Sequence, residues 1–265
     1  MSRKVVFITD ADGASGDALI ARFGEPDTDL LLASRQENKA WEQRLAPFRS
    51  AGSQVLVVQV DLCSGRELAA MLDQAERELG AVDVMIHNAH LVRPALVESC
   101  EEETFTETMN ALAKSAFLCT QAVGKRMAAK GRGSIVFAGS IHSEKPAGSA
   151  FPFSAAQGAV KMLAREAALF LGRHGIRVNY IESGPLDGSE AGFGGELSGV
   201  YDSYNYKVPA ERLGSSRDMA ELAYFLSKDG AGFVNGADIR LDGGFVLHYM
   251  DHRMKKPTEG DTRLS

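Results

Sequence analysis

Short apolar runs alternate along the chain with longer segments whose apolar residues recur at helical spacing. Most of the short runs consist almost entirely of β-branched and aliphatic residues, which is typical of strands covered on both faces of a sheet. The predicted strands are residues 5–9, 30–33, 55–60, 82–87, 134–138, 177–181 and 238–241. The longer segments predict helices at residues 16–23, 65–80, 103–130, 154–174 and 216–227.

This alternation of strand and helix predicts a parallel sheet with right-handed crossovers and helices on both of its faces. We expect one α/β domain over residues 1–250. Residues 186–209 form a long Gly- and Tyr-containing insertion, and its length predicts a lid or substrate loop. The polar residues 251–265 predict a frayed C-terminal tail.

The composition fits one such domain, because 45% of the 265 residues are hydrophobic and can bury a substantial core. The net charge of −6 is spread without long runs of one sign, whereas nucleic acid binding needs a clustered basic face. Cys63, Cys100 and Cys119 are widely spaced outside any Cys-x-x-Cys pair, a pattern typical of reduced cysteines in a cytosolic protein. No apolar run is long enough for a signal peptide or a membrane span. We therefore expect a soluble cytoplasmic protein that binds neither nucleic acid nor membrane.

The loop after the first predicted strand combines small and acidic residues and leads into a helix. Its sequence is Thr9-Asp10-Ala11-Asp12-Gly13-Ala14-Ser15-Gly16, which resembles the Thr-Gly-x-x-x-Gly-x-Gly loop of the short-chain dehydrogenase/reductase (SDR) family. Asp10 stands at the first glycine of that pattern, Ala14 at the second and Gly16 at the third. In the family, these glycines let the backbone approach the pyrophosphate of a dinucleotide at a helix N-terminus.

Further motifs follow in the family's order, and the resemblance covers about residues 4–247. Arg35 ends the second strand, where members that prefer NADP place an arginine for the 2′-phosphate, and Asp61 follows the third strand, where the family's aspartate meets the adenine. His87-Asn88-Ala89-His90 resembles Asn-Asn-Ala-Gly, and Ser183-Gly184 stands in place of Pro-Gly. The resemblance implies a Rossmann-like α/β fold, that is, a doubly wound parallel sheet in a single domain. It implies NADP(H) or NAD(H) as cofactor, bound by Thr9, Gly16, Arg35, Asp61, Asn88 and Gly184.

The acidic residues of the first loop predict weak binding of that cofactor, or none. Asp10 and Asp12 would place carboxylates beside the phosphates, and each pair of like charges costs roughly 3 kcal/mol at about 5 Å and an effective dielectric of about 20. The loop contains no lysine or arginine that would offset this repulsion.

The catalytic half departs from the family pattern at two of its four positions. In the family, Tyr-x-x-x-Lys supplies a proton-transferring tyrosine and a lysine that holds the ribose, while a serine and an asparagine complete the site. Ser140 and Asn110 match, but Phe153 and Gln157 replace the tyrosine and the lysine. Acid–base catalysis needs an exchangeable proton near neutral pH, and loss of one such group costs roughly 10²–10⁴-fold in rate. Phe153 has no such proton.

Other side chains near this site are candidates for a substitute acid, base or anchor. His142 follows Ser140 by two residues and His90 lies at the expected mouth of the cleft, and an imidazole titrates near neutrality. Two further possibilities stay open. Ser140 could act as a nucleophile with one of these histidines as its base, or Glu182 and one of these histidines could form an acid–base pair. Lys161 lies one helical turn beyond the replaced lysine and is a candidate to reach a ribose or phosphate. The insertion offers hydroxyl groups from Tyr201, Tyr204 and Tyr206, whereas no histidine or cysteine spacing indicates a metal site.

These departures lie in the chemistry rather than in the fold. They predict an SDR-family protein of alcohol/ketone redox metabolism that is a non-catalytic subunit. The expected partner is an active SDR paralogue in a hetero-oligomer, or a second copy in a homo-oligomer, joined through the helices at residues 103–130 and 154–172. Three alternatives stay open: a stand-alone NADP(H)-dependent oxidoreductase with a substitute proton donor, a redox-neutral lyase, dehydratase or isomerase acting on a small molecule, and a small-ligand sensor. The candidate catalytic positions are Ser140, Asn110, Phe153, Gln157 and His142.

Overall fold

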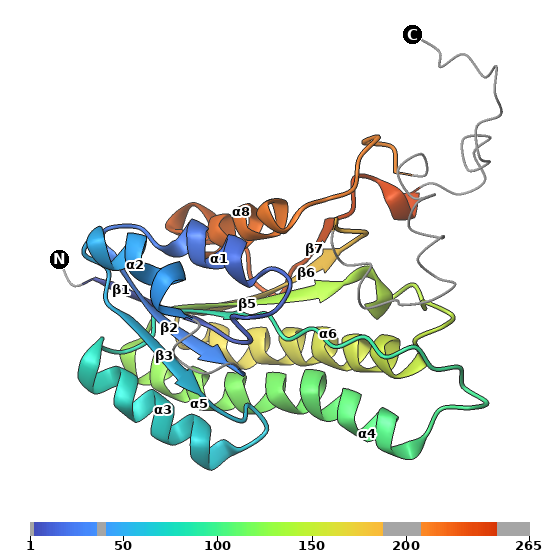
Figure 1. The fold of residues 1–265 in the computed structure, drawn as a ribbon, viewed down its shortest axis with the longest axis horizontal. Helices are drawn as coiled ribbons and strands as arrows, with labels where there is room; N and C mark the ends of the chain where they lie inside the picture. Colours follow the sequence, from blue (N-terminus) through green and yellow to red (C-terminus); the bar gives the residue numbers. More distant parts are fainter. Residues whose placement is uncertain (1–2, 36–40, 188–207, 248–265) are drawn as a thin grey trace, which may run out of the picture.

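Parallel strands form one sheet at the centre of the molecule (Figure 1). The computed structural model describes residues 3–35, 41–187 and 208–247. In these residues the sheet has seven strands in the order β3-β2-β1-β4-β5-β6-β7. The order runs outward in opposite directions from β1 and from β4, which is the doubly wound arrangement of a Rossmann-like fold and confirms the predicted fold class. The strands are β1 (Lys4–Ile8), β2 (Thr28–Ser34), β3 (Val55–Gln59), β4 (Val84–His87), β5 (Gly133–Ser140), β6 (Ile176–Ser183) and β7 (Asp238–Leu241).

Helices cover both faces of this sheet (Figure 1). The helices on one face are α1 (Gly16–Phe23), α2 (Glu42–Ser50) and α8 (Ser216–Ser227). Those on the other face are α3 (Gly65–Glu78), α5 (Ser115–Lys130) and α6 (Phe151–Gly172). A further helix, α4 (Glu102–Met109), continues into α5 through a π-helical turn at Asn110–Lys114. Short 3₁₀ turns lie at Ile141–Ser143, Asp229–Ala231 and Phe245–Leu247.

Alternation along the strands divides the core into two clusters. Val5 and Phe7 of β1 belong to the cluster with α3, α5 and α6, whereas Val6 and Ile8 belong to the cluster with α1, α2 and α8. Because helices bury both sides, β1 is a continuous apolar run rather than an alternating one. Each such side chain contributes roughly 1.5–3 kcal/mol of burial energy against the entropy of ordering the chain.

Most predicted elements are found within a few residues of their expected ends, and the differences have local causes. Helix α6 begins at Phe151, three residues before the predicted start, because Pro152 is tolerated in a first helical turn. The single helix predicted at residues 103–130 is interrupted by the π-helical turn. Helix α2 was not predicted, since only Leu45 of its residues is buried and its apolar pattern is correspondingly weak.

Two predicted segments fall largely or wholly outside the described residues. The insertion at 186–209 is described only at residues 186–187 and 208–209, and Leu186 pairs with Gly214, beyond the insertion, in an isolated bridge. The tail at 251–265 and the three tyrosines of the insertion lie outside the described part altogether. The domain limits and the lid therefore stay predictions. No helix in the described ranges is long and apolar enough to cross a membrane.

Candidate functional site

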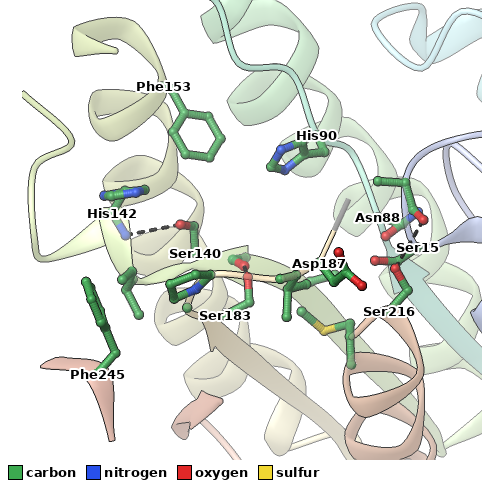
Figure 2. Close-up of a pocket in the computed structure, with 18 residues that line it drawn as sticks. Ser15, Asn88, His90, Ser140, His142, Phe153, Ser183, Asp187, Ser216 and Phe245 are labelled. Atoms are coloured by element: carbon green, nitrogen blue, oxygen red, sulfur yellow. Dashed lines mark hydrogen bonds between the residues drawn. The ribbon is translucent and has the colours of Figure 1, made fainter. Parts of the chain in front are cut away.

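The loops after β1, β4, β5 and β6 meet at the carboxyl edge of the sheet and enclose a cavity (Figure 2). This is the edge at which doubly wound sheets bind their ligands. Figure 2 shows aromatic side chains, Phe153 and His142, at one end of the cavity, and polar side chains at the other. The structure thus brings together five of the predicted site residues, namely Asn88, Ser140, His142, Phe153 and Gly184. Asp187 and Ser216 also line the cavity, although the sequence did not single them out.

Phe153 forms an apolar wall between two histidines (Figure 2). Its ring centroid lies 5.4 Å from that of His90 and 6.0 Å from that of His142, and both contacts are edge-to-face. Such contacts add to the apolar burial of the ring, of which only 1% is exposed. Position 153 therefore contributes packing to the cavity and offers no exchangeable proton.

Both histidines of the cavity are held neutral near pH 7. His142 Nδ1 lies 2.7 Å from the carbonyl oxygen of Lys145. A carbonyl only accepts, so Nδ1 carries the proton. Burial lowers the pKa of His142, and the Lys145 carbonyl opposes this shift in part. Burial, and to a lesser extent the nearby His142, also lowers the pKa of His90. The backbone N–H of His142 donates to Ser140 Oγ at 3.2 Å, which fixes the turn that carries the imidazole.

Gln157 is not among the residues that line the cavity, and it bonds to Tyr180 of strand β6. The Tyr180 hydroxyl lies 2.7 Å from Gln157 Oε1 and accepts the backbone N–H of Ser140 at 3.0 Å. Both side chains are buried, and burial raises the pKa of the Tyr180 phenol well above its ordinary value. Gly139 makes room for this ring, because a Cβ there would lie 2.0 Å from Tyr180 Cζ. The structure therefore places Gln157 behind the wall of the cavity.

Lys161 lies in a buried network of charges rather than in the cavity. Its ammonium group pairs with Glu144 and Glu182, and Asp238 lies 3.5 Å away. Glu182 also pairs with Arg240 at 3.3 Å. Both the idea that Glu182 partners a histidine and the idea that Lys161 reaches a ribose are therefore wrong, because each side chain is engaged by the other. The network stabilises the join between α6, β6 and β7.

The Asp10 carboxylate forms an ion pair with Arg35, the arginine that the family pattern assigns to a phosphate. The carboxylate lies 3.1 Å from Arg35 Nε through Oδ1 and accepts from an Arg35 terminal nitrogen at 3.3 Å through Oδ2. Asp12 accepts the backbone N–H of Arg35 at 3.1 Å. The loop itself contains no lysine or arginine, and the cation that offsets its acidic charge is Arg35, which comes from the end of the neighbouring strand β2. Burial raises the pKa of Asp10, and the charge of Arg35 acts against that shift.

The remaining predicted residues of the loop hold its shape. Thr9 Oγ1 accepts the backbone N–H of Asn88 at 2.9 Å, and the Asn88 side chain donates to the Asp10 carbonyl at 3.2 Å. A Cβ at Gly16 would lie 1.9 Å from the Ala11 carbonyl oxygen, so only glycine fits there. Gly184 is similarly confined, because a Cβ would lie 2.6 Å from Asp242 Cβ.

Asn110 lines a second groove, whereas Ser140 lines the first cavity. This groove also contains Arg35 and Asp61. Its walls include the carboxyl ends of β2 and β3 and the loop after β4. The Asp61 carboxylate accepts the backbone N–H of Cys63 at 2.8 Å. The structure thus separates the two residues that match the family's catalytic pattern, Ser140 and Asn110, into different hollows of the surface.

Comparisons with known proteins define the family. A family model described as enoyl-(acyl carrier protein) reductase matches residues 14–246. Gluconate 5-dehydrogenase of Gluconobacter oxydans is 28% identical over 230 residues, which are 86% of this chain and 88% of that protein. Cis-4-hydroxycyclohexanecarboxylate dehydrogenase of Sinomonas cyclohexanicum is 28% identical over 246 residues, or 92% and 97% of the two chains.

A solved structure of similar shape is a gluconate 5-dehydrogenase from Burkholderia cenocepacia in complex with NADP and tartrate. It is 25% identical, covers 94% of this chain and 97% of its own, and superposes with a TM-score of 0.85. The chain belongs to the short-chain dehydrogenase/reductase family. Among the described residues, no group of three or more His, Cys, Asp or Glu side chains is arranged to hold a metal ion.

Proposed function

We propose that this SDR-family protein of alcohol/ketone redox metabolism is a non-catalytic subunit that assembles with an active SDR dehydrogenase. The observation that carries the proposal is the buried contact between Gln157 and Tyr180. A side chain held in the core has no access to a ribose, and Phe153 beside it has no proton to transfer. The two positions that would perform the family's proton transfer therefore serve packing instead.

The cofactor side supports the same proposal. The Burkholderia relative was solved with NADP. In this chain, however, Arg35, which stands where the family pattern places an arginine for the 2′-phosphate, already pairs with Asp10. A phosphate would have to displace this carboxylate and sit beside Asp12, at a cost of roughly 3 kcal/mol for each like-charged pair at about 5 Å. These residues fit a dinucleotide phosphate poorly, and we expect at most weak binding of NADP(H) or NAD(H).

An apolar stripe on α6 supports the proposed assembly. Its residues recur at helical spacing and are exposed in the described chain, although large apolar side chains are seldom gathered on a free surface. The fractions exposed are 41% for Phe151, 53% for Met162, 71% for Leu169 and 64% for Phe170. On α5, Phe117 is 48% exposed. Such a surface suits the helices of a second SDR subunit.

Co-expression with an SDR from the same source that retains Tyr-x-x-x-Lys tests the partnership. We expect a mixed oligomer by native mass spectrometry, and we expect Phe170→Glu to abolish it. Phe225→Glu is the matched control, because Phe225 is also exposed, at 50%, but lies on α8 across the sheet. If Phe170→Glu and Phe225→Glu affect the mixed oligomer equally, or if no mixed oligomer forms, the proposed subunit role is wrong.

A redox-neutral enzyme is the second candidate, and the orientation of His142 favours it. Because Nδ1 donates to the Lys145 carbonyl, Nε2 is the basic nitrogen of this ring, at the wall of the cavity. A base of this kind exchanges the proton on carbon next to a ketone without any nicotinamide. Proton exchange of a small ketone in D₂O, followed by NMR, tests this candidate. Exchange that disappears in His142→Gln would support it, and no exchange above buffer would exclude it.

A further inference from the structure

A further hollow lies at the amino edge of the sheet, opposite the edge that carries the cavity and the second groove. This amino-edge hollow has a volume of about 560 Å³, and its walls come from the first residues of β1, β4, β5 and β6 and from the end of α8. The described residues that line it include four cations and two carboxylates, namely Arg3, Lys4, Arg132, Arg177, Asp83 and Asp229. The hollow is therefore positively charged, although the whole chain has a net charge of −6.

Helix ends account for part of this positive charge. The helices that precede parallel strands end at this edge, and their last carbonyl oxygens attract cations. Arg177 donates to the carbonyl oxygens of Lys228 and Val234 at 3.3 and 3.4 Å. Lys130, the last residue of α5, pairs with Asp83 at 2.5 Å. Arg177 thus satisfies backbone carbonyls, and Asp83 has a cation from outside the hollow.

Two cations of the hollow have no carboxylate of their own. In the part of the chain that the structure describes, no ion pair or hydrogen bond engages the Lys4 ammonium group. Arg132 lies 3.6 Å from Asp83, but that carboxylate already pairs with Lys130 and accepts the backbone N–H of Val5 at 3.0 Å. Lys4 is exposed, and 65% of the Arg132 side chain is exposed. Both side chains are therefore accessible to an anionic partner.

The positive charge is spread along the edge of the sheet rather than gathered at one point. Arg3 pairs with Asp29 near the start of β2, whereas Arg177 lies on β6. Four strand spacings separate β2 from β6, which is roughly 19 Å at about 4.8 Å for each spacing. A single phosphate or carboxylate group is too small to contact charges so far apart. An extended peptide of about six residues covers this length, at about 3.3 Å per residue.

The two carboxylates of the hollow favour a peptide over a nucleic acid. A nucleic acid carries a negative charge at every phosphate, so a strand laid along the edge would meet Asp83 and Asp229. A peptide can place uncharged residues beside these two carboxylates and acidic residues beside Lys4 and Arg132. A guanidinium group also matches the geometry of a carboxylate, because it can form two parallel hydrogen bonds with it.

We propose that the amino-edge hollow is a docking site for an extended acidic segment of a partner protein, bound through Lys4 and Arg132. The proposal goes beyond the subunit role and does not depend on it, because no residue of the apolar stripe on α6 lines the hollow.

Calorimetric titration of the full chain with a capped hexaglutamate peptide tests the proposal. We expect binding that weakens as the salt concentration rises from about 50 mM to about 500 mM, because salt screens exposed charges. We expect Lys4→Gln/Arg132→Gln to weaken binding at least about fivefold, which is the size of effect that the loss of two exposed ion pairs produces.

Arg66→Gln/Arg217→Gln is the matched control. It removes the same charge from two exposed arginines, which lie in the first turns of α3 and α8 at the opposite edge of the sheet. We expect it to change the affinity by less than about twofold, because these charges are more than a Debye length from the hollow. Thermal melting checks that both double variants are folded.

The proposal is overturned if hexaglutamate does not bind at about 1 mM, if capped hexaglutamine binds as tightly, or if the two double variants weaken binding equally. It is overturned equally if inorganic phosphate or a single-stranded oligonucleotide binds more tightly than hexaglutamate, because the hollow would then be a phosphate site. The mixed oligomer is measured separately, so a failure of this proposal is distinguishable from a failure of the subunit role.

Discussion

The Tyr180 hydroxyl lies 2.7 Å from Gln157 Oε1, and it joins the helix that carries the altered motif to the strand beside it. The same hydroxyl accepts the backbone N–H of Ser140 at 3.0 Å. Because both side chains are buried, Gln157 Oε1 needs this hydroxyl as its donor, whereas the hydroxyl also lies 3.3 Å from the Ser140 carbonyl oxygen. Position 157 therefore belongs to the core of this protein and not to its cleft.

Tyr180→Phe is expected to destabilise the protein by about 1–3 kcal/mol. The substitution keeps the ring and leaves the Ser140 N–H and Gln157 Oε1 buried without this partner. Urea unfolding measures the loss. Tyr224→Phe serves as the control, because the Tyr224 hydroxyl bonds to the half-exposed Glu25. A control loss as large as that of Tyr180→Phe would contradict the special role of the buried contact.

Gly139→Ala is expected to cost about 1–3 kcal/mol or more, because the new methyl group would overlap the Tyr180 ring. The cost should fall sharply in a Tyr180→Ala background, since the overlap is then removed. A double-mutant cycle by urea unfolding gives this coupling. Gly230→Ala is a suitable control, because no atom lies within 4 Å of its Cβ position. If the free-energy costs of the two substitutions are additive, Gly139 is not needed to accommodate the Tyr180 ring.

The sequence predicts the fold well because fold and pattern depend on the same apolar periodicity. The parallel sheet and the helices on both of its faces follow from runs such as residues 5–9 and 55–60, whereas the doubly wound arrangement follows from the family resemblance. The loop residues that meet at one edge, such as Ser140 and Gly184, follow from the family motifs. What the sequence could not show is where each polar side chain points, because that depends on neighbours from other elements.

Three side chains illustrate this limit. Arg35 bonds to Asp10, 25 residues away, and no local pattern predicts that pair. Lys161 has the spacing of a cleft residue but forms an ion pair with Glu182 on the next strand. The buried role of Tyr180 could have been predicted from one signal in the sequence. A large polar aromatic residue stands in a buried strand, and the strand that pairs with it carries a glycine, Gly139, which leaves room for the ring.

The stability of the protein is expected to fall as the pH drops from about 6.5 to 4. Burial lowers the pKa of His87 from 6.5 to about 4. The unfolded chain therefore takes up a proton on this imidazole in a range where the folded chain does not. Between pH 7.5 and 5, this linkage removes about 2 kcal/mol. His90 and His142, whose pKa values are also lowered, act in the same direction.

Urea unfolding of the unmodified protein and of His87→Asn at both pH values checks this prediction. The variant removes the titrating group, so its stability should depend less on pH by about 2 kcal/mol. An equally steep pH dependence in His87→Asn would assign the effect to other groups.

Lys161→Met is expected to destabilise the protein by about 3–5 kcal/mol, because it leaves the buried Glu182 without its closest cation. Replacing both residues, in Lys161→Met/Glu182→Leu, should recover much of this loss. Arg126→Met is the control, since Arg126 pairs with the exposed Asp73, and an exposed pair contributes at most about 1 kcal/mol. If the double variant is less stable than Lys161→Met, the charge network does not act through this pair.

Turnover by the purified full chain alone shows whether this protein is a non-catalytic subunit. The assay follows NADPH and NADH oxidation with a panel of ketones that includes 5-ketogluconate, since two relatives are gluconate 5-dehydrogenases. We expect no oxidation above the protein-free rate with either nucleotide. Oxidation at an ordinary enzymatic rate, of about 1 s⁻¹ or more, would contradict the non-catalytic role. The chain would then transfer a hydride and a proton without a tyrosine at position 153.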